Sequence, residues 1–544
     1  MTRTGNEAII EQFLADGITC MFGNPGTVEQ GFLDAVEKFE EMRYVLTLQE
    51  GVAVGIADGY ARATGGPALV QLHSGVGLGN GIGMMYQAMR GHAPLVVIAG
   101  ESGVRYDAMD AQMAADLVAM ARPVTKYATR VIDPSSVLRV LRRALKIAMT
   151  PPRGPVFVSL PLDVLDHPND EPIVPTSLPM TESLPVPELV DQAAGLLARA
   201  ERPLVLIGDG VATSGAQSAL TRVAEQLGAD VWGVDYAEVG IDGRHPLYRG
   251  QTGHMFGEVS RAIVRDADAI LVVGTYLFPE VFPDLSTPFR ADARIVHIDL
   301  NAYEIAKNHP VTLGLVADPK ATLTAISERL ERRLTSADRE AAALRLRTLR
   351  DRAQGDTTHS LVGEFAARLA AVAPADLMVF DESLTASGAI SAHLPPGLPG
   401  HWFQTRGGSL GVGIPGAIGM KLAHPDKTVV GFTGDGGSMY TFQALATAVR
   451  EGVGAKFVIC NNRSYRLLDL NIEKYWKERG IPHHAYPRAF DLSDLGLAFV
   501  DIARGFGVDG MLVEKPAQLD EALDRMLAND RPFLLDLKSD EGEL

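Results

Sequence analysis

The segment Val429-Val430-Gly431-Phe432-Thr433-Gly434-Asp435-Gly436-Gly437-Ser438 decides how the rest of this sequence is interpreted. Its first half is an apolar run typical of a buried strand, and its second half is a glycine turn that carries one carboxylate. We expect a helix to begin after the turn, near Tyr440. In an open parallel sheet, ligands bind beyond the carboxyl ends of the strands, so the sequence predicts that Asp435 faces a ligand.

A pair of asparagines follows the next predicted strand, residues 456–460. Asn462 lies 27 residues after Asp435 (462 − 435), about the length of one strand–helix–strand crossover, so the two side chains are expected at adjacent strand ends. A carboxylate, an amide oxygen and a backbone carbonyl are ligands suited to Mg²⁺. The glycines also let backbone amides approach a diphosphate closely. A simple tight turn at residues 434–436 is the alternative, and the asparagine pair argues against it.

The order of strand, glycine turn and helix recurs along the chain, which favours parallel sheets covered by helices on both faces. We predict an α/β fold of three doubly wound parallel-sheet domains, at residues 1–182, 188–345 and 358–544. A polar, proline-rich linker is expected at 166–187, and a charged helix at 321–352 closes the second domain. The predicted strands are 20–23, 69–72, 95–99, 156–160, 204–207, 269–274, 295–300, 377–380, 428–432, 456–460 and 533–537, with helices at 6–15 and 52–63.

Composition and charge exclude several functional classes. The chain has 544 residues, of which 46% are hydrophobic and 22% charged, the balance of a globular protein. Its formal net charge of −17 repels phosphate backbones, so nucleic acid is not an expected partner. The two cysteines, Cys20 and Cys460, form no metal or disulfide motif. Because no signal-peptide core or membrane-length apolar run is present, we expect a cytoplasmic protein without a membrane partner.

The motif around Asp435 resembles that of the thiamine-diphosphate (ThDP) enzyme family, in which Gly-Asp-Gly is followed some two dozen residues later by one or two asparagines. The resemblance implies ThDP and Mg²⁺ as cofactors. It implies that Mg²⁺ is held by Asp435, by the side chain of Asn462 and by the backbone carbonyl of Ser464. It also implies that the three domains are pyrimidine-binding, middle and diphosphate-binding, in chain order.

Two further stretches resemble cofactor-binding segments of the family. In residues 407–417, Leu410 takes the place of a bulky side chain that wedges between the two rings of the cofactor, and the Gly408 carbonyl would accept a hydrogen bond from the aminopyrimidine. A plain core role for Leu410 is the alternative. Residues 381–385 resemble the hydroxyl-rich loop that cradles the diphosphate. The implied cofactor-binding residues of this domain are Ser383, Leu384, Thr385, Gly408, Leu410, Gly434, Asp435, Gly436, Gly437, Ser438, Asn462, Ser464 and Tyr465.

The first domain is expected to supply a carboxyl group to the same cofactor. Residues 44–48 are a predicted strand, Glu50 follows it, and a helix continues from Val52. A carboxyl group hydrogen-bonded to the pyrimidine ring promotes loss of the thiazolium C2 proton, and burial favours its neutral, proton-sharing form. The resemblance implies that Glu50 is this catalytic and cofactor-binding residue. A charged first-turn residue is the alternative.

Within the family, two segments of the first domain look most like benzoylformate decarboxylases. Residues 23–27 match their first loop, with Thr27 in place of a substrate-binding serine. Residues 72–74 match their Leu-His-Ser segment, whose histidine transfers protons beside the thiazolium, and the near-neutral pKa of imidazole suits that work. A structural role for His73 is the alternative. The implied catalytic residues are Glu50, His73, Thr27 and Ser74.

Two regions depart from that group. Benzoylformate decarboxylases have a second active-site histidine in the middle domain, whereas residues 273–282 contain none and Val281 falls at about its position. That proton-transfer group is therefore replaced or unnecessary. Arg463 and Arg466 follow the metal motif where glycine is common in the family. An arginine there could pair with a substrate carboxylate or an acyl-CoA phosphate, or could be surface charge. The roles of Glu473, His483 and His484 are left open.

The resemblance implies a ThDP- and Mg²⁺-dependent lyase, and we expect a non-oxidative decarboxylase of a small-molecule 2-oxo acid, with carboligation to a second carbonyl as a further outcome. The alternatives are an acetolactate-synthase-type carboligase, an acyl-CoA lyase and a catalytically silent ThDP-binding protein. Binding of FAD or CoA to the middle domain is left open. Because family sites form between the first domain of one subunit and the third of another, a homodimer or homotetramer with active sites at the subunit interface is implied.

Overall fold

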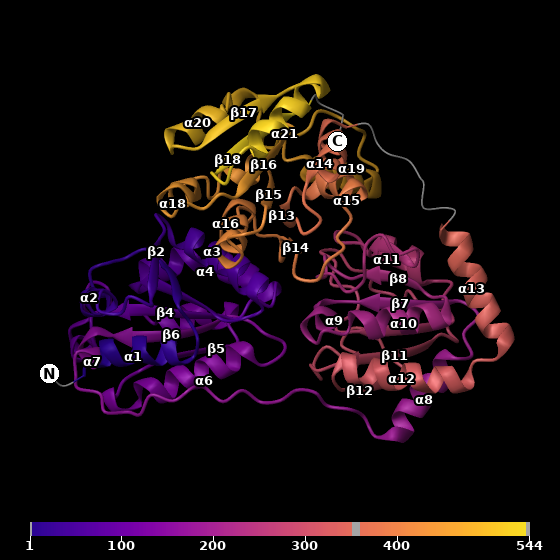
Figure 1. The fold of residues 1–544 in the computed structure, drawn as a ribbon, viewed down its shortest axis with the longest axis horizontal. Coiled ribbons are helices and arrows are strands. Elements are labelled where there is room, and N and C mark those ends of the chain that lie inside the picture. The colour runs from indigo at the N-terminus through magenta and orange to yellow at the C-terminus, as the bar shows by residue number, and fades with distance from the viewer. Residues whose placement is uncertain (1–2, 351–359, 540–544) are drawn as a thin grey trace. The chain divides into compact units, whose positions relative to one another are not determined.

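The strands of the protein form three parallel six-stranded sheets, each flanked by helices (Figure 1). The computed structural model describes residues 3–350 and 360–539. Strands β1–β6 form the first sheet, β7–β12 the second and β13–β18 the third. The prediction of three doubly wound α/β sheets is therefore confirmed.

The first sheet has the strand order β2-β1-β3-β4-β6-β5. Side chains alternate between its two faces, so that Val96 and Ile98 of one strand join a core under α1 and α6. The opposite face is covered by α3 and α4. The strands are Cys20–Gly23 (β1), Arg43–Leu46 (β2), Ala68–His73 (β3), Leu95–Glu101 (β4), Tyr127–Arg130 (β5) and Val156–Pro161 (β6), and the helices named are Gly5–Ala15 (α1), Glu50–Thr64 (α3), Ser74–Arg90 (α4) and Val137–Met149 (α6).

The second sheet has the order β12-β11-β10-β7-β8-β9 and a core on each face. Val205 and Ile207 point to one core, and Leu204 and Leu206 point to the other, which is the period of two that a doubly covered strand shows. Its strands are Pro203–Ile207 (β7), Asp230–Gly233 (β8), Tyr248–Gln251 (β9), Ala269–Val273 (β10), Arg294–Asp299 (β11) and Leu313–Val316 (β12), with helices Pro187–Leu197 (α8), Gln217–Leu227 (α10), Gly257–Val264 (α11) and Pro319–Arg333 (α12).

In the third sheet, five parallel strands follow the order β13-β15-β16-β18-β17. The neighbours β15 and β16 end beside each other, with Gly434 paired to Cys460, so the residues that follow both strands meet at one sheet edge. The strands are Met378–Glu382 (β13), Trp402–Gln404 (β14), Val429–Gly434 (β15), Lys456–Asn461 (β16), Asp509–Val513 (β17) and Phe533–Lys538 (β18), with helices Leu361–Val372 (α14), Gly413–Ala423 (α16), Arg466–Arg479 (α19), Phe499–Gly505 (α20) and Leu519–Leu527 (α21).

The chain divides into two compact units. One unit contains residues 1–178, 357–394 and 405–544, and the other contains residues 179–356 and 395–404. Inside the first unit, α3 packs directly against α16, so the helix that begins at Glu50 touches the helix that follows Leu410. None of the described helices is both long and apolar enough to cross a bilayer.

Two expectations about helices are wrong. The single helix predicted at 321–352 is two helices, α12 and Ser336–Arg350 (α13), because Thr335 and Asp338 exchange hydrogen bonds in a cap that starts a new helix. Residues 351–352 lie outside the described part of the chain. The helix expected near Tyr440 begins earlier: the glycine turn itself forms one helical turn, Asp435–Ser438 (α17), which Ser438 closes by a bond to the Asp435 carbonyl, and Ala444–Arg450 (α18) follows.

Candidate active site

The structure brings Asp435 to the turn that follows β16. Asp435 begins α17 and is buried, with its Oδ1 accepting a hydrogen bond from the Gly436 amide at 2.8 Å. Burial raises its pKa to about 6, while backbone amides including those of Arg463 and Ser464 act in the opposite direction. Asn462 Oδ1 accepts from the Ser464 amide at 3.0 Å. The predicted neighbourhood of Asp435 with residues 462–464 is therefore present.

The residues at this turn fit a hard divalent cation. The Oδ2 atom of Asp435 is buried and has no hydrogen-bond partner, which is a costly arrangement unless a cation or a donor meets it. Two neighbouring oxygens, the side-chain amide oxygen of Asn462 and the backbone carbonyl oxygen of Ser464, are ligands of the kind that Mg²⁺ prefers. The part of the chain that the structure describes contains no group of three or more His, Cys, Asp or Glu side chains placed to hold a metal ion.

Tyr465 lies over the glycine turn. A Cβ atom at Gly436 would overlap the Tyr465 ring, so glycine is required for this close approach. The Tyr465 amide donates to the Phe490 carbonyl at 2.8 Å, which fixes the backbone after residues 462–464.

Glu382 joins three of the predicted cofactor-binding segments, and the sequence analysis assigned it no role. It ends β13, is 1% exposed, and accepts hydrogen bonds from the amides of Gly411 and Gly413. The Thr433 hydroxyl lies 3.4 Å from the same carboxylate. Because desolvation outweighs these bonds, the pKa of Glu382 is raised to about 7. A buried carboxyl before a Ser-Leu-Thr loop is the signal that could have identified it.

The hydroxyl-rich loop and the cofactor-bending stretch take unusual backbone conformations. Leu384 has φ of +52°, and the Ser383 amide and hydroxyl both bind Asp381 Oδ1, at 2.9 and 2.6 Å. Gly408 has φ of +71° and open space where a Cβ would stand, and Leu410 is half-buried. Thr385 lies in the short 3₁₀ helix Leu384–Ala386.

Glu50 is held by two asparagines of its own domain. It begins α3 and is 6% exposed. Its two carboxylate oxygens accept hydrogen bonds from Asn24 Nδ2 at 3.2 Å and from Asn80 Nδ2 at 3.0 Å. A simple first-turn charge would face solvent, whereas this carboxyl group is buried and oriented. The two asparagines are functional candidates that the sequence analysis missed.

His73 forms a pair with Glu29. Its Nδ1 lies 3.0 Å from Glu29 Oε2, and its side chain is 17% exposed. Glu29 is almost completely buried, and burial raises its pKa while His73 acts in the opposite direction. A Cβ at Gly77 would lie 3.3 Å from both Glu50 and His73, so only a glycine separates these two predicted catalytic residues. Glu29 was missed, although it stands only two residues beyond Thr27, the last residue of the matched loop.

The two remaining predicted catalytic residues differ in exposure. Ser74 is buried and begins α4 with φ of +44°, directly after His73. Thr27 is exposed in the turn before Gln30–Val36 (α2). Ser74 is therefore enclosed at the start of α4, while the Thr27 side chain is exposed.

A second histidine–carboxylate pair lies in the middle domain, next to the loop that lacks the expected histidine. Val281 is 54% exposed, and its amide donates to the His254 carbonyl at 3.0 Å. His254 Nδ1 lies 3.1 Å from Asp235 Oδ1, and its ring packs against Tyr236 with centroids 4.8 Å apart and planes tilted by 40°. Glu280 beside them is buried with its Oε2 unpartnered.

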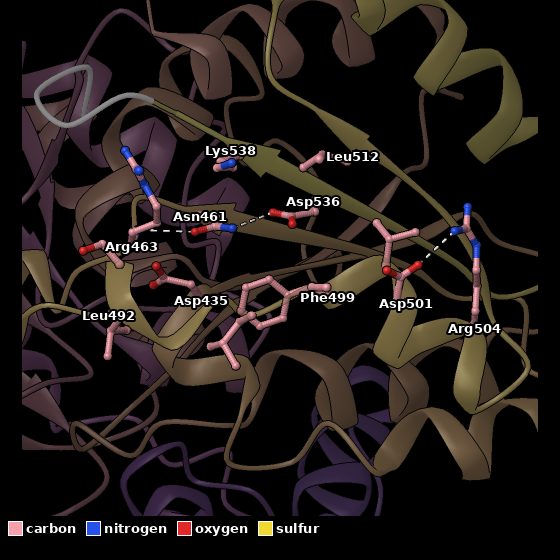
Figure 2. Close-up of a pocket in the computed structure, with 15 residues that line it drawn as sticks. Asp435, Asn461, Arg463, Leu492, Phe499, Asp501, Arg504, Leu512, Asp536 and Lys538 are labelled. Carbon is pink, nitrogen blue, oxygen red and sulfur yellow. Dashed lines mark hydrogen bonds and ion pairs between the residues drawn. The ribbon is translucent and has the colours of Figure 1, made fainter.

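The residues whose roles were left open have structural partners. Arg466 lies 3.6 Å from Asp469, and Glu473 accepts a bond from the Tyr486 hydroxyl. His483 and His484 pack against Trp476, with ring centroids 5.4 and 4.3 Å away, which favours an aromatic cluster over a ligand role. Arg463 lines a cavity of about 540 Å³, together with Asp435, Asn461, Phe499, Asp536 and Lys538 (Figure 2).

Comparison with known proteins decides the family. Three family models match in order: the N-terminal TPP binding domain of thiamine pyrophosphate enzymes at residues 3–120, their central domain at 190–326 and their C-terminal TPP binding domain at 386–537. Benzoylformate decarboxylase of Pseudomonas aeruginosa is 31% identical over 98% of each chain. The chain belongs to the ThDP enzyme family. The resemblance seen in the sequence is confirmed, and the protein is a ThDP-dependent enzyme.

Other relatives of this ThDP enzyme differ in their reactions. Acetolactate synthase isozyme 3 large subunit of Escherichia coli is 27% identical, over 99% of this chain and 95% of its own. The structure of a ThDP-dependent 4-hydroxybenzoylformate decarboxylase from Rhodococcus jostii superposes with a TM-score of 0.87 at 27% identity, over 99% of this chain and 100% of its own.

Proposed function

We propose that this ThDP enzyme is a Mg²⁺-dependent lyase that removes CO₂ from a 2-oxo acid without oxidation. One observation carries the proposal: the Glu29–His73 pair and the buried Glu50 carboxyl group flank the same residue, Gly77. A proton-sharing carboxyl group and an oriented imidazole are the two functions that a decarboxylation with protonation of its product requires. The likeness to benzoylformate decarboxylase supports the same class.

The cofactor would be held at both of its ends. Asp435, Asn462 and the Ser464 carbonyl would bind Mg²⁺, and the Ser383–Thr385 loop with the α17 amides would bind the diphosphate. When bound, ThDP supplies an electron sink for the electron pair of the broken C–C bond. Glu50 would share a proton with the pyrimidine ring, and its bonds from Asn24 and Asn80 hold the carboxyl group in place.

His73 would move protons at its Nε2 atom. Since Nδ1 is directed at Glu29, the imidazole is oriented and its other nitrogen is left to meet the substrate. The Glu29 carboxylate also stabilises the charged imidazolium, as the acid of a catalytic triad does. Thr27, exposed in the adjoining loop, is proposed to contact the substrate.

The carboligase alternative is favoured by one specific departure. The middle-domain position at which benzoylformate decarboxylases carry a histidine is the exposed Val281, so a group that would protonate or release the product is absent from that position. An enzyme that protonates its product slowly has more time to join it to a second carbonyl compound.

The test is CO₂ release from a panel of aromatic, aliphatic and hydroxylated 2-oxo acids, each with and without a second aldehyde. Benzoylformate, 4-hydroxybenzoylformate, phenylpyruvate and pyruvate cover the substrate shapes. CO₂ release with a matching amount of free aldehyde supports the decarboxylase, and CO₂ release with a hydroxyketone product supports the carboligase. No CO₂ from any member, with ThDP and Mg²⁺ bound, rejects both.

We further propose a homodimer or homotetramer whose sites combine the first domain of one subunit with the third domain of another. The contacts that orient Glu50 come from its own domain, and those that orient Asp435 come from the third domain. Light scattering gives the oligomeric state, and a fully active monomer would reject the proposal.

A further inference from the structure

The buried side chain of Asn461 connects two elements beside the metal turn. It ends β16 and is 4% exposed. Its Nδ2 donates to Asp536 Oδ1 of β18 at 2.9 Å, and its Oδ1 accepts from the Arg463 amide at 3.3 Å. Figure 2 shows these two bonds in series, running from Asp536 through Asn461 to Arg463.

The amide at the end of this series belongs to a residue with a conformation that L-residues avoid. Arg463 has φ of +57°, in the left-handed region that favours glycine. It stands between Asn462 and Ser464, so its conformation sets the direction of both groups that would bind Mg²⁺. Its carbonyl accepts from the Leu492 amide at 2.8 Å. On its other side, the Arg463 amide donates a hydrogen bond to Asn461 Oδ1, so hydrogen bonds restrain the Arg463 backbone at both its amide and its carbonyl.

Asp536 is hydrogen-bonded to Asn461, and its charge also interacts with Lys538. It is 3% exposed, and in the β16–β18 register it pairs with Ile459, two residues before Asn461. Lys538, two residues further along β18, pairs with Glu514 at 2.9 Å. A buried carboxylate needs a hydrogen-bond donor, and the Asn461 amide group supplies one.

We propose that Asp536 is a positioning residue for the Mg²⁺ turn, acting through Asn461 to fix Arg463 and so the Asn462 side chain and the Ser464 carbonyl. The inference rests on the Mg²⁺ ligands proposed above and is independent of the substrate. Outer groups that orient metal ligands typically change affinity about 10–100-fold when they are removed.

The experiment is a calorimetric titration of metal-free protein with MgCl₂ at a fixed ThDP concentration, without substrate. Asp536→Ala and Asn461→Ser are each expected to weaken Mg²⁺ binding about tenfold or more. Asp536→Asn keeps an oxygen that accepts from Asn461 and is expected to stay within about threefold of the wild type. The variant with both Asp536→Ala and Asn461→Ser should bind Mg²⁺ as tightly as the single variant that has the lower Mg²⁺ affinity. Both changes break the same series of hydrogen bonds, so their effects should not add.

Two controls make the result specific. Asp501 lines the same cavity and pairs with Arg504 at 3.1 Å, so Asp501→Ala removes one carboxylate without touching Asn461 and should leave Mg²⁺ affinity unchanged. Asp435→Ala removes a proposed ligand and should abolish binding. Circular dichroism and the melting temperature report whether each variant is folded.

Three results would overturn the proposal: wild-type Mg²⁺ affinity in folded Asp536→Ala or Asn461→Ser, additive losses in the double variant, or an equal loss in Asp501→Ala. If Asp536→Ala does not fold, Asn461→Ser with Asp536→Asn decides the same question. These results are distinguishable from a failure of the proposed decarboxylation. A protein that binds Mg²⁺ and ThDP as described but releases no CO₂ would contradict only the proposed reaction, not the positioning role of Asp536.

Discussion

His73 Nδ1 and Glu29 Oε2 lie 3.0 Å apart in the first domain, and the glutamate of this pair is almost completely buried. The pair orients the imidazole and presents its other nitrogen. Replacing His73 with Ala is therefore expected to lower kcat by about 10²–10⁴-fold while KM changes little, because a group that transfers protons acts mainly in the transition state. Steady-state kinetics on the best substrate of the panel measures both constants. A rise in KM alone would make His73 a binding residue.

Glu29→Gln tests the other partner of that pair. The amide keeps the size and one acceptor oxygen but loses the charge that stabilises the imidazolium. We expect kcat to fall, by less than in His73→Ala, and the double variant to be no slower than His73→Ala alone. Additive effects would show that Glu29 acts independently of His73.

Glu50→Gln is expected to abolish turnover and to leave ThDP binding largely intact, since the amide fills the same space but cannot share a proton with the pyrimidine. Calorimetry measures the affinity for ThDP, and CO₂ release measures the rate of turnover.

If each site combines domains of two subunits, mixing the Glu50→Gln protein with the Asp435→Ala protein under conditions that let subunits exchange should restore activity. A mixed dimer then contains one site in which both residues are intact. Wild-type rates in Glu50→Gln alone would reject its role.

The raised pKa of Glu382 predicts that the free energy of unfolding depends on pH. Its pKa is about 7 in the folded protein and near 4.5 in the unfolded chain, so between these values the folded state holds a proton that the unfolded state has released. The free energy of unfolding therefore falls as pH rises from about 4.5 to 7, by about 3 kcal/mol in total. Glu382→Gln should remove this slope in denaturant titrations at several pH values. Glu364→Gln, at a half-buried glutamate of the same domain that pairs with Arg368 at 3.6 Å, gives the control, and an unchanged slope in Glu382→Gln would contradict the assignment.

The sequence carried enough information for the central strands of each sheet, but not for the side-chain partners or for six strands at or next to the sheet edges: β5, β8, β9, β12, β14 and β17. Residues 429–434 and 456–461 were predictable because buried parallel strands are continuous apolar runs that end in glycine or asparagine. The break between α12 and α13 was missed, since the cap formed by Thr335 and Asp338 is local chemistry inside a uniformly charged stretch. Glu29, Glu382 and Asp536 were missed because burial of a lone carboxyl group depends on which distant segments cover it.

The contact between α3 and α16 has a consequence for engineering this enzyme. A Cβ atom at Gly59 would overlap the backbone of Gly416, so at this point the two helices meet backbone to backbone. Directed evolution toward new substrates should therefore find few tolerated changes along this crossing. Libraries that randomise the loop at Thr27 would keep the scaffold and sample new specificities.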